Sequence, residues 1–392
     1  MNHWLEAVLL GLAIASGAFI ACTYLLFPLL LVALARLRRA EPGAEGQPDG
    51  DWPELQVVVS CYNEAASIRD RLRNVLAQNY PADRLRVVVI DDGSTDGSDQ
   101  VVEELASADS RVSLFRLDKN RGKNLALNRA RQAGRLAAEL LCLTDADSEF
   151  AGGALRAAVA QMADARIGLV GGEVRFRFGP GATARSESHY WRLENALRRA
   201  EGRMGVLVSA PGQLIVMRGE LLEELPSDAN TDFAVSLSVL AQGRRCVVAP
   251  GAVVRTPFPG GEEAAGRRRR RTILRALQTI RAYRGRPNRW ARAIVFWHKT
   301  ARFHLALPAA VLLAASAGGA AVAGSPPWFA LTAVQAAFYL TAGAGWLASA
   351  AGARLPLAST AHQFVRQHVI AFRAVIEHAR GGRVQRWTPS GR

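Results

Sequence analysis

Two long apolar segments, one near each end of the chain, constrain the fold more than any other feature of the sequence. Residues 7–35 and residues 303–353 contain no Asp, Glu, Lys or Arg. A helix crosses the apolar part of a bilayer with about 20 apolar residues. The sequence therefore predicts membrane-spanning helices toward both ends of the chain. The alternative is that these segments are buried helices of a soluble protein.

A Gly-Ser-Pro-Pro sequence at 324–327 divides the second apolar segment. Proline ends a helix, so we expect two spans, 304–323 and 328–350, joined by a tight turn. Three of the four residues that follow the first span are arginines, and the outer flanks of the second pair are also basic. The positive-inside rule then predicts that the N-terminus lies outside, and that residues 40–302 and the C-terminus lie in the cytoplasm.

The positive charge of the chain is concentrated beside the second apolar segment. The formal net charge is +15 and the pI about 10.7, and residues 267–302 hold 13 Lys or Arg and no Asp or Glu. Such charge suits nucleic acid, an anionic membrane surface or a phosphate-bearing substrate. The excess lies next to a predicted span, and no nucleic-acid recognition motif accompanies it, so we expect no nucleic-acid partner. The four cysteines form neither a disulfide framework nor a zinc-ligand spacing, which favours reduced thiols.

Between its ends the chain alternates strand-like and helical patterns. A linker rich in Gly, Pro and Asp is expected at 41–53. The predicted strands lie at 55–60, 87–90, 112–115 and 140–143, and the predicted helices at 65–78, 98–107 and 123–136. This alternation predicts an α/β domain whose mostly parallel sheet is covered by helices on both faces.

Polar residues follow each of the four predicted strands. The polar runs are 61–64, 91–97, 120–124 and 145–147. Ligands of parallel sheets bind beyond the carboxyl ends of the strands, so these runs should meet at one edge. An aromatic ring, several carboxylates and a lysine at one edge suit a nucleoside diphosphate, because lysine meets phosphate as a point charge.

The run after the fourth strand contains two carboxylates, Asp145 and Asp147, separated by one residue. In extended backbone, such residues face the same side. Two carboxylates can hold a divalent ion that keeps waters and substrate phosphates as its other ligands, and the ion would neutralise a leaving diphosphate. A plain turn is the alternative, because Asp is common in turns. The position of the pair after a buried strand favours the metal site.

The four motifs together resemble the family 2 glycosyltransferases in order and spacing. They are VVVSCYNE at 57–64, VIDDGSTD at 89–96, NRGK at 120–123 and LTDAD at 143–147, and the likeness covers about residues 55–280. The resemblance implies a GT-A fold, with a Rossmann-like nucleotide half, and inverting transfer from a nucleotide sugar with Mg²⁺ or Mn²⁺. By it, Tyr62, Glu64 and Asp92 would hold the nucleoside. Lys123 and Asp145 would meet the diphosphate, and Asp145 and Asp147 would hold the metal.

The resemblance continues toward the C-terminus and implies a catalytic base. Pro-Gly-Gln at 211–213 and Asn-Thr-Asp-Phe at 230–233 follow in the family's order. Asp232 stands where the family keeps the base that takes the proton of the acceptor hydroxyl. Thr231 replaces the family's usual Glu there. Asp232 could also serve as the N-cap of the helix that follows, and the two roles are compatible.

Five consecutive arginines, 267–271, resemble the Gln-x-x-Arg-Trp motif of processive synthases, with Arg268 at the Gln and Arg271 at the Arg. A membrane anchor does not require five arginines, and arginine binds diphosphate well. We therefore expect Arg268 and Arg271 to bind the donor, Arg271 foremost, and the remaining arginines to face lipid headgroups. Thr272 replaces the motif's Trp, and three spans are few for a polymer channel, so transfer of a single sugar is favoured over processive synthesis.

The expected organisation divides the chain into six parts. They are an N-terminal span and basic flank (1–40), a linker (41–53), a cytoplasmic GT-A domain (54–260), a basic interfacial segment (261–302), two spans (303–353) and a cytoplasmic tail (354–392). The predicted function is transfer of a sugar, from a UDP-sugar first of all, to a lipid-linked or saccharide acceptor in envelope or exopolysaccharide synthesis at a bacterial inner membrane. A processive synthase, or an inactive nucleotide- or sugar-binding component of an export complex, is the alternative. An export or assembly partner protein is compatible with either.

Overall fold

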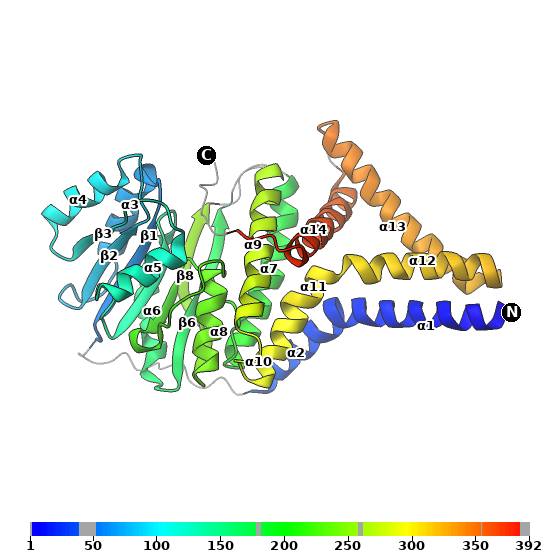
Figure 1. The fold of residues 1–392 in the computed structure, drawn as a ribbon, viewed down its shortest axis with the longest axis horizontal. Coiled ribbons are helices and arrows are strands. Elements are labelled where there is room, and N and C mark those ends of the chain that lie inside the picture. The colour runs from blue at the N-terminus through cyan, green and yellow to red at the C-terminus, as the bar shows by residue number, and fades with distance from the viewer. Residues whose placement is uncertain (1, 39–51, 178–181, 258–261, 354, 385–392) are drawn as a thin grey trace.

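A computed structural model describes residues 2–38, 52–177, 182–257, 262–353 and 355–384. Most of the predicted linker (41–53) and the end of the C-terminal tail lie outside the described residues. A central β-sheet flanked by helices forms one part of the molecule, and long helices project from one side of it (Figure 1). The α/β class predicted from the sequence is confirmed.

The sheet has eight strands in the order β3-β2-β1-β4-β7-β6-β8-β5. Its first half is parallel and consists of β1 (Leu55–Cys61), β2 (Leu85–Asp91), β3 (Val112–Arg116) and β4 (Leu140–Asp145). The helices that connect these strands are α3 (Ala65–Leu76), α4 (Ser98–Ala108) and α5 (Lys123–Gln132). All seven elements agree with the predicted ones to within a few residues. The four polar runs therefore lie along the edge where these parallel strands end.

The second half of the sheet is mixed. Strands β6 (Ile167–Arg177) and β8 (Arg245–Pro257) are parallel neighbours, but β7 (Ile215–Arg218) runs antiparallel between β4 and β6, and β5 (Glu149–Phe150) runs antiparallel to β8. Strand β7 starts at the ligand edge, where the pocket-lining residue Gln213 leads into it, and it therefore runs opposite to β4 and β6. The prediction of a parallel sheet is therefore correct for the first half of the sheet, whereas the second half contains antiparallel strands.

Alternate residues of the central strands enter two separate cores, one on each face of the sheet. Val57 and Val59 pack with α3, α4 and α6 (Ala154–Ala160), whereas Val58 packs with α5, α7 (Ala182–Arg203) and α8 (Thr231–Ala241). Strands buried on both faces read as continuous apolar runs, as 57–59 does. Cys61, Cys142 and Cys246 are free and buried in these cores, as expected for reduced thiols.

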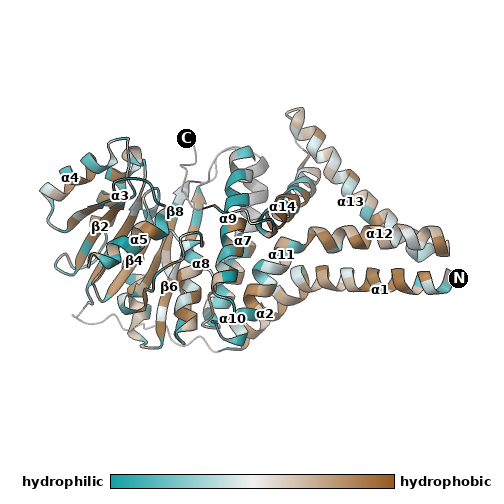
Figure 2. Ribbon diagram, in the orientation of Figure 1, coloured by the Kyte–Doolittle hydropathy of each residue, from teal (hydrophilic) through white to brown (hydrophobic). Residues whose placement is uncertain are grey.

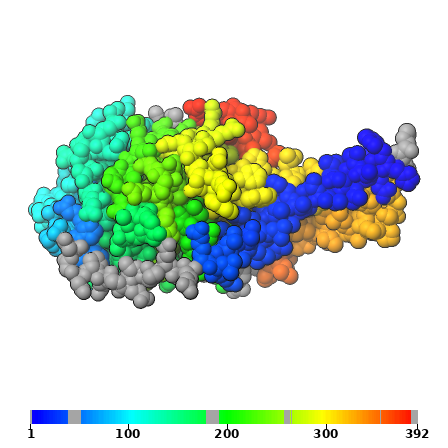
Figure 3. Space-filling model, turned by 90° about the horizontal axis from the view of Figure 1, so that it is seen from below, coloured from blue at the N-terminus to red at the C-terminus, as the bar shows by residue number. Residues whose placement is uncertain are grey.

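Two helices among the described residues are long and apolar enough to cross a membrane, namely His3–Leu37 and Ala306–Ala323. The first consists of α1 (Asn2–Ala21), a π-helical turn (Cys22–Leu26) and α2 (Phe27–Leu37), and α1 lies beside α12 (Ala306–Ala323) (Figure 1). Apolar residues cover both helices (Figure 2), which project from the domain as an arm (Figure 3).

The third predicted span, 328–350, forms α13 (Pro326–Ala350), which is long enough to cross a membrane but is not apolar enough to count as a candidate. Thr, Gln, Gly and Ser dilute its apolar residues. Gly324 adopts a positive φ of 59° and ends α12, so the turn between the two helices is where the sequence predicted it.

The remaining helices join the arm to the sheet. They are α9 (Glu262–Ala282), α10 (Arg289–Val295), a second π-helical turn (Phe296–Thr300), α11 (Ala301–His304) and α14 (Pro356–Ala379). Helix α14 packs against α9 and α13. Arg270 of α9 forms an ion pair with Glu377 of α14, so this arginine of the basic run has a protein partner instead of the expected lipid headgroup.

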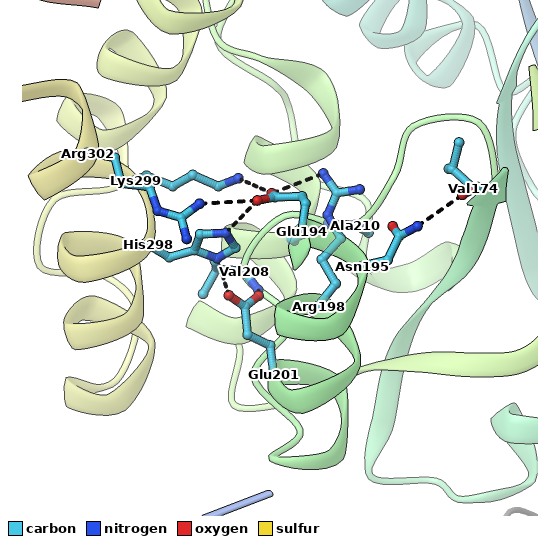
Figure 4. Close-up of polar contacts among 11 residues, drawn as sticks. Val174, Glu194, Asn195, Arg198, Glu201, Val208, Ala210, His298, Lys299 and Arg302 are labelled. Carbon is cyan, nitrogen blue, oxygen red and sulfur yellow. Dashed lines mark hydrogen bonds and ion pairs between the residues drawn. The ribbon is translucent and has the colours of Figure 1, made fainter. Parts of the chain in front are cut away.

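One buried carboxylate connects the sheet domain to the helices of the arm (Figure 4). Glu194 of α7 is 3% exposed and accepts hydrogen bonds from His298 Nε2 at 3.0 Å, Lys299 Nζ at 3.2 Å and Arg302 Nη1 at 3.3 Å. Arg198 Nη2 adds an ion pair at 3.5 Å. Burial alone would raise the pKa of Glu194, but these cations hold that pKa well below its usual range.

The π-helical turn Phe296–Thr300 explains how neighbouring residues can converge on this carboxylate. The widened turn changes the angular spacing of the side chains, and both His298 and Lys299 reach Glu194. His298 also hydrogen-bonds Glu201, about two helical turns further along α7, through its Nδ1 atom. The arm is therefore attached to α7 by ionic contacts that exclude water.

We predict that Glu194→Gln destabilises the protein by about 3–5 kcal/mol, because several cations lose a buried counter-charge. Glu263→Gln is the matched control, since Glu263 pairs with Arg267 at 3.5 Å but its side chain is 91% exposed, and its loss should cost less than about 1 kcal/mol. Denaturant unfolding in detergent measures both. The folded pKa of Glu194 is depressed from 4.5, so its contribution is present above that pH and disappears in acid. An equal decrease in the free energy of unfolding of the two variants would contradict the prediction.

Candidate active site

A pocket opens at the carboxyl edge of the parallel strands, where the sequence predicted that the polar runs would meet. Eight of the nine predicted site residues line it. They are Tyr62, Glu64, Asp92, Lys123, Asp145, Asp147, Arg268 and Arg271. These side chains come from the carboxyl ends of β1, β2 and β4 and the residues just after them, from the first residue of α5, and from the second and third turns of α9. Residues distant in the sequence are thus gathered at one cavity.

Asp92 holds the loop that leads into α5. Its Oδ1 atom accepts a hydrogen bond from the backbone N–H of Arg121 at 2.8 Å, and its Oδ2 atom accepts one from Gly122 at 2.7 Å. Burial raises the pKa of Asp92, and these two backbone hydrogen bonds oppose the rise. The carboxylate therefore fixes the loop in addition to facing the pocket, a structural role that the sequence motif did not indicate.

The loop after β2 approaches the α5 loop too closely for a side chain. Gly93 has a φ of 76°, and a Cβ atom there would lie 2.6 Å from backbone atoms of Lys119. Only glycine tolerates both the conformation and the distance. The glycine of the Asp-Asp-Gly sequence thus keeps the two pocket loops in contact.

Lys123 is the first residue of α5 and contacts the carboxylate pair directly. Its Nζ donates a 2.6 Å hydrogen bond to Asp145 Oδ1, and its side chain is 18% exposed. Burial lowers the pKa of Lys123, but the charges of Asp145 and Asp232 outweigh that effect, so its pKa is raised. The lysine is held as a cation between two carboxylates.

The carboxylates of Asp145 and Asp147 both face the pocket. Among the described residues no group of three or more His, Cys, Asp or Glu could hold a metal by itself. A pair of carboxylates beside an open pocket nevertheless fits Mg²⁺ or Mn²⁺, because such ions keep waters and substrate phosphates as ligands. The donor set is consistent with a metal that binds together with a phosphate-bearing ligand.

Asp232 lies next to this pocket without lining it. It is the second residue of α8, whose N-cap is Asn230: the Asn230 side chain accepts the N–H of Phe233 at 3.2 Å. The alternative role of Asp232 as N-cap is therefore wrong. Burial raises the pKa of Asp232, and the charge of Lys123 opposes the rise. A base with a raised pKa accepts a proton more readily.

Gly212 brings the backbone up against the Asp232 carboxylate. The three atoms nearest to a Cβ added at Gly212 are all carboxyl atoms of Asp232, at distances that no real Cβ contact shows. The neighbouring Gln213 lines the pocket. The Pro-Gly-Gln segment thus contacts the Asp232 carboxylate through Gly212 and the cavity through Gln213.

Arg268 and Arg271 reach the pocket from α9, as predicted. Burial lowers the pKa of Arg271, and the neighbouring Arg268 lowers it further. Sequence reasoning missed Arg275, one helical turn beyond Arg271, which donates to the backbone oxygen of Ala229 at 2.7 Å and whose charge acts on Asp232. The i, i+4 spacing from Arg271 was the signal that could have found it.

Sequence reasoning also missed Arg71, which supports the carboxylate pair from below the sheet edge. Its side chain is buried, stacks on the Phe150 ring with 3.9 Å to the centroid, and donates to Thr144 Oγ1 at 2.7 Å. Thr144 in turn donates to the backbone oxygen of Gln213 at 2.6 Å. Burial lowers the pKa of Arg71 to about 10. An arginine on the apolar face of an amphipathic helix was the available signal.

Residues 56–225 match the family model Glycosyl transferase family 2. The match includes the polar runs at the pocket edge and the Pro-Gly-Gln segment, and it ends a few residues before Asp232. With the GT-A architecture and the arrangement of the pocket, this match shows that the part of the chain that carries the polar runs, less than half of its length, is similar to the family 2 glycosyltransferases.

Two proteins of known activity have sequences similar to part of this chain. An N-acetylglucosaminyltransferase of Mesorhizobium japonicum is 30% identical over 241 residues, which are 56% of this chain and 55% of that protein. An N-acetylglucosaminyltransferase of Rhizobium sp. is 27% identical over 234 residues, 56% of this chain and 52% of that protein. The chain thus spans about half the length of these curated relatives.

A solved structure resembles nearly the whole chain. The mannosyltransferase PcManGT of Pyrobaculum calidifontis, in complex with GDP-Man and Mn²⁺, aligns with a TM-score of 0.70 and 26% identity. The alignment covers 96% of this chain and 99% of that one. The likeness therefore includes the arm helices as well as the sheet domain.

We predict that Gly212→Ala lowers the turnover of sugar transfer at least about tenfold, because the new methyl group forces the Asp232 carboxylate to move and a misplacement of about 1 Å can cost two orders of magnitude. Gly152→Ala is the matched control, since a Cβ added at Gly152 would meet nothing within 4 Å and its φ is not positive. Donor turnover with purified protein measures both. Equal activity of the two variants would count against the crowding of Asp232.

Proposed function

We propose that this chain transfers a sugar from a nucleoside-diphosphate sugar to an acceptor hydroxyl, with inversion at the anomeric carbon. One observation carries the proposal: carboxylates, a lysine and two arginines from separated motifs line a single pocket at the carboxyl edge of the parallel strands. The match of residues 56–225 to the family 2 glycosyltransferase model supports the reaction class. The alternative of an inactive binding component is disfavoured, because the predicted catalytic carboxylates are all present around this site.

The donor would lie along the pocket with its nucleoside toward β1 and β2 and its diphosphate toward α5 and α9. Tyr62, Glu64 and Asp92 line the pocket and would contact the base and ribose. Lys123 and Arg271 provide the positive charge that a diphosphate requires, and Arg268 adds to it. Charges of this kind also stabilise the diphosphate as it leaves.

Asp145 and Asp147 would hold a divalent cation, Mg²⁺ or Mn²⁺, together with the diphosphate of the donor. When bound, the cation would supply charge neutralisation for the leaving diphosphate. The relative that was crystallised with GDP-Man and Mn²⁺ supports this choice of metals.

Asp232 would act as the general base. It removes the proton of the acceptor hydroxyl while the acceptor oxygen bonds to the anomeric carbon and the bond to the diphosphate oxygen breaks. The products are the glycosylated acceptor and a nucleoside diphosphate. The raised pKa of Asp232 favours this role.

The acceptor would reach the site near the membrane surface, as a lipid-linked or saccharide molecule. The arm carries two helices apolar enough to span a bilayer, and the basic segment 267–302, which precedes one of them in the sequence, contributes Arg268 and Arg271 to the pocket. We propose a multi-pass protein of the bacterial inner membrane whose catalytic domain faces the cytoplasm. Thr272 in place of a Trp favours addition of a single sugar, and product length in a purified assay tests this against processive synthesis.

We predict that the preferred nucleotide raises the melting temperature in the presence of Mn²⁺, because a ligand that binds only the folded state stabilises it. The screen includes UDP-GlcNAc and GDP-Man, which represent the relatives, and other UDP- and dTDP-sugars. A ligand at about 100 times its Kd stabilises by about 2.7 kcal/mol, which is several degrees. A flat response across all nucleotide sugars would argue against a donor site in this pocket.

We predict that Asp232→Asn lowers the turnover of sugar transfer by about two to four orders of magnitude, which is the usual contribution of a general base. Donor affinity should change little, because Asp232 does not line the pocket. Asp228→Asn, which removes a carboxylate a few residues earlier in the chain, serves as the control. Unchanged turnover in Asp232→Asn would remove the base assignment.

A further inference from the structure

One contact at the pocket obstructs the proposed metal site. Lys123 Nζ donates to Asp145 Oδ1 at 2.6 Å, a length typical of a strong charge-assisted hydrogen bond. An ammonium group and a divalent cation cannot share this oxygen without strong repulsion. A metal ion that used the ammonium-bound oxygen of Asp145 would therefore have to displace Lys123.

The protein offers little to compensate for that displacement. Within the residues that the structure describes, no third His, Cys, Asp or Glu joins Asp145 and Asp147 in a potential metal cluster. Lys123 would also be left in a largely buried position, with a side chain only 18% exposed and Arg275 nearby. A displaced and unpaired ammonium at such a position is costly.

A diphosphate would remove the obstruction in two ways. It would give Lys123 an alternative anionic partner within the same pocket, and it would add oxygen ligands to the metal. The backbone at Lys123 need not move, because Asp92 holds the preceding residues Arg121 and Gly122 through their N–H groups. Rotation of the lysine side chain suffices.

We propose that Lys123 is a positioning residue that makes metal binding depend on the donor: without a diphosphate it occupies Asp145, and with one it turns to the phosphates and frees Asp145 for the metal. This inference rests on the proposed function and deepens it. By thermodynamic linkage, the metal must strengthen nucleotide binding by the same factor by which the nucleotide strengthens metal binding. The free protein would then bind divalent ions weakly.

The test measures Mn²⁺ binding to the full chain in detergent by the electron paramagnetic resonance signal of the free ion, without nucleotide and with saturating UDP or GDP. In the unchanged protein, we expect the nucleotide to tighten Mn²⁺ binding at least about tenfold, within the usual range of coupling between sites. In Lys123→Met, we expect Mn²⁺ alone to bind about tenfold more tightly, and the nucleotide effect to shrink.

Lys119→Met is the matched control, because it removes the same charge from the same loop at an exposed position outside the pocket lining. It should leave Mn²⁺ binding without nucleotide unchanged. Melting temperatures verify that both variants are folded. If Lys123→Met binds Mn²⁺ alone no more tightly than the unchanged protein, or if Lys119→Met has the same effect, the inference is wrong.

The same measurements separate this inference from the proposed function. If no nucleotide binds, with or without Mn²⁺, the donor site itself is wrong, whatever Lys123 does. If nucleotide and Mn²⁺ both bind but Lys123→Met behaves like the unchanged protein, the donor site is supported. The proposal that Lys123 blocks metal binding at Asp145 is then wrong. If Mn²⁺ binds to none of the proteins under any condition, both the metal assignment and the inference are overturned.

Discussion

The ionic contacts around Glu194 connect the two parts of this molecule, and the location of the active site relative to the arm depends on them. Taking a carboxylate out of water is costly unless cations and hydrogen-bond donors replace the solvent. Glu194 meets that condition with donors from two sides. Arg198 comes from its own helix, and His298, Lys299 and Arg302 come from the segment that leads into the apolar helix α12.

The ionic contacts around Glu194 also lie close to the proposed base, Asp232. Arg198 lies within range of both Glu194 and Asp232. Arg302 also stacks over the Tyr24 ring at 5.6 Å, and Tyr24 shares a 2.6 Å hydrogen bond with His368 of α14. Residues from both apolar ends of the chain and from the sheet domain thus meet in one continuous polar network. The position of α7 therefore depends on the arm.

Much of the sheet domain could be predicted because its signals are local. A continuous apolar run such as 57–59 indicates a strand buried on both faces, and the carboxyl ends of parallel strands share one edge. Those two facts suffice to place Tyr62, Asp92 and Asp145 together at that edge. The same argument places Lys123 there. The family resemblance added the two arginines of α9, whose approach to the pocket depends on long-range packing that no local pattern describes.

What the sequence did not reveal are the residues whose roles depend on burial by distant segments. Arg71 and Arg275 looked like ordinary helix-surface cations, but packing of α3 under β4 and of α9 over the α8 loop buries them. Glu194 gives no local signal of its role, because His298, Lys299 and Arg302 lie about 100 residues away in sequence. The direction of β7 was missed because its reversal depends on the short Pro-Gly-Gln loop and not on the apolar pattern of the strand.

The arginine run shows why charge counting alone misjudges such a chain. Residues three apart on a helix share a face, so Arg268 and Arg271 point together into the pocket, whereas Arg270 turns toward α14 and pairs with Glu377. One helix therefore contributes charge to the donor site and also a contact to the arm. A run that resembles a simple positive-inside anchor is divided by helical periodicity into residues that line the pocket and a residue that pairs with α14. The part proposed to bind phosphate therefore depends on how α14 holds α9 in place.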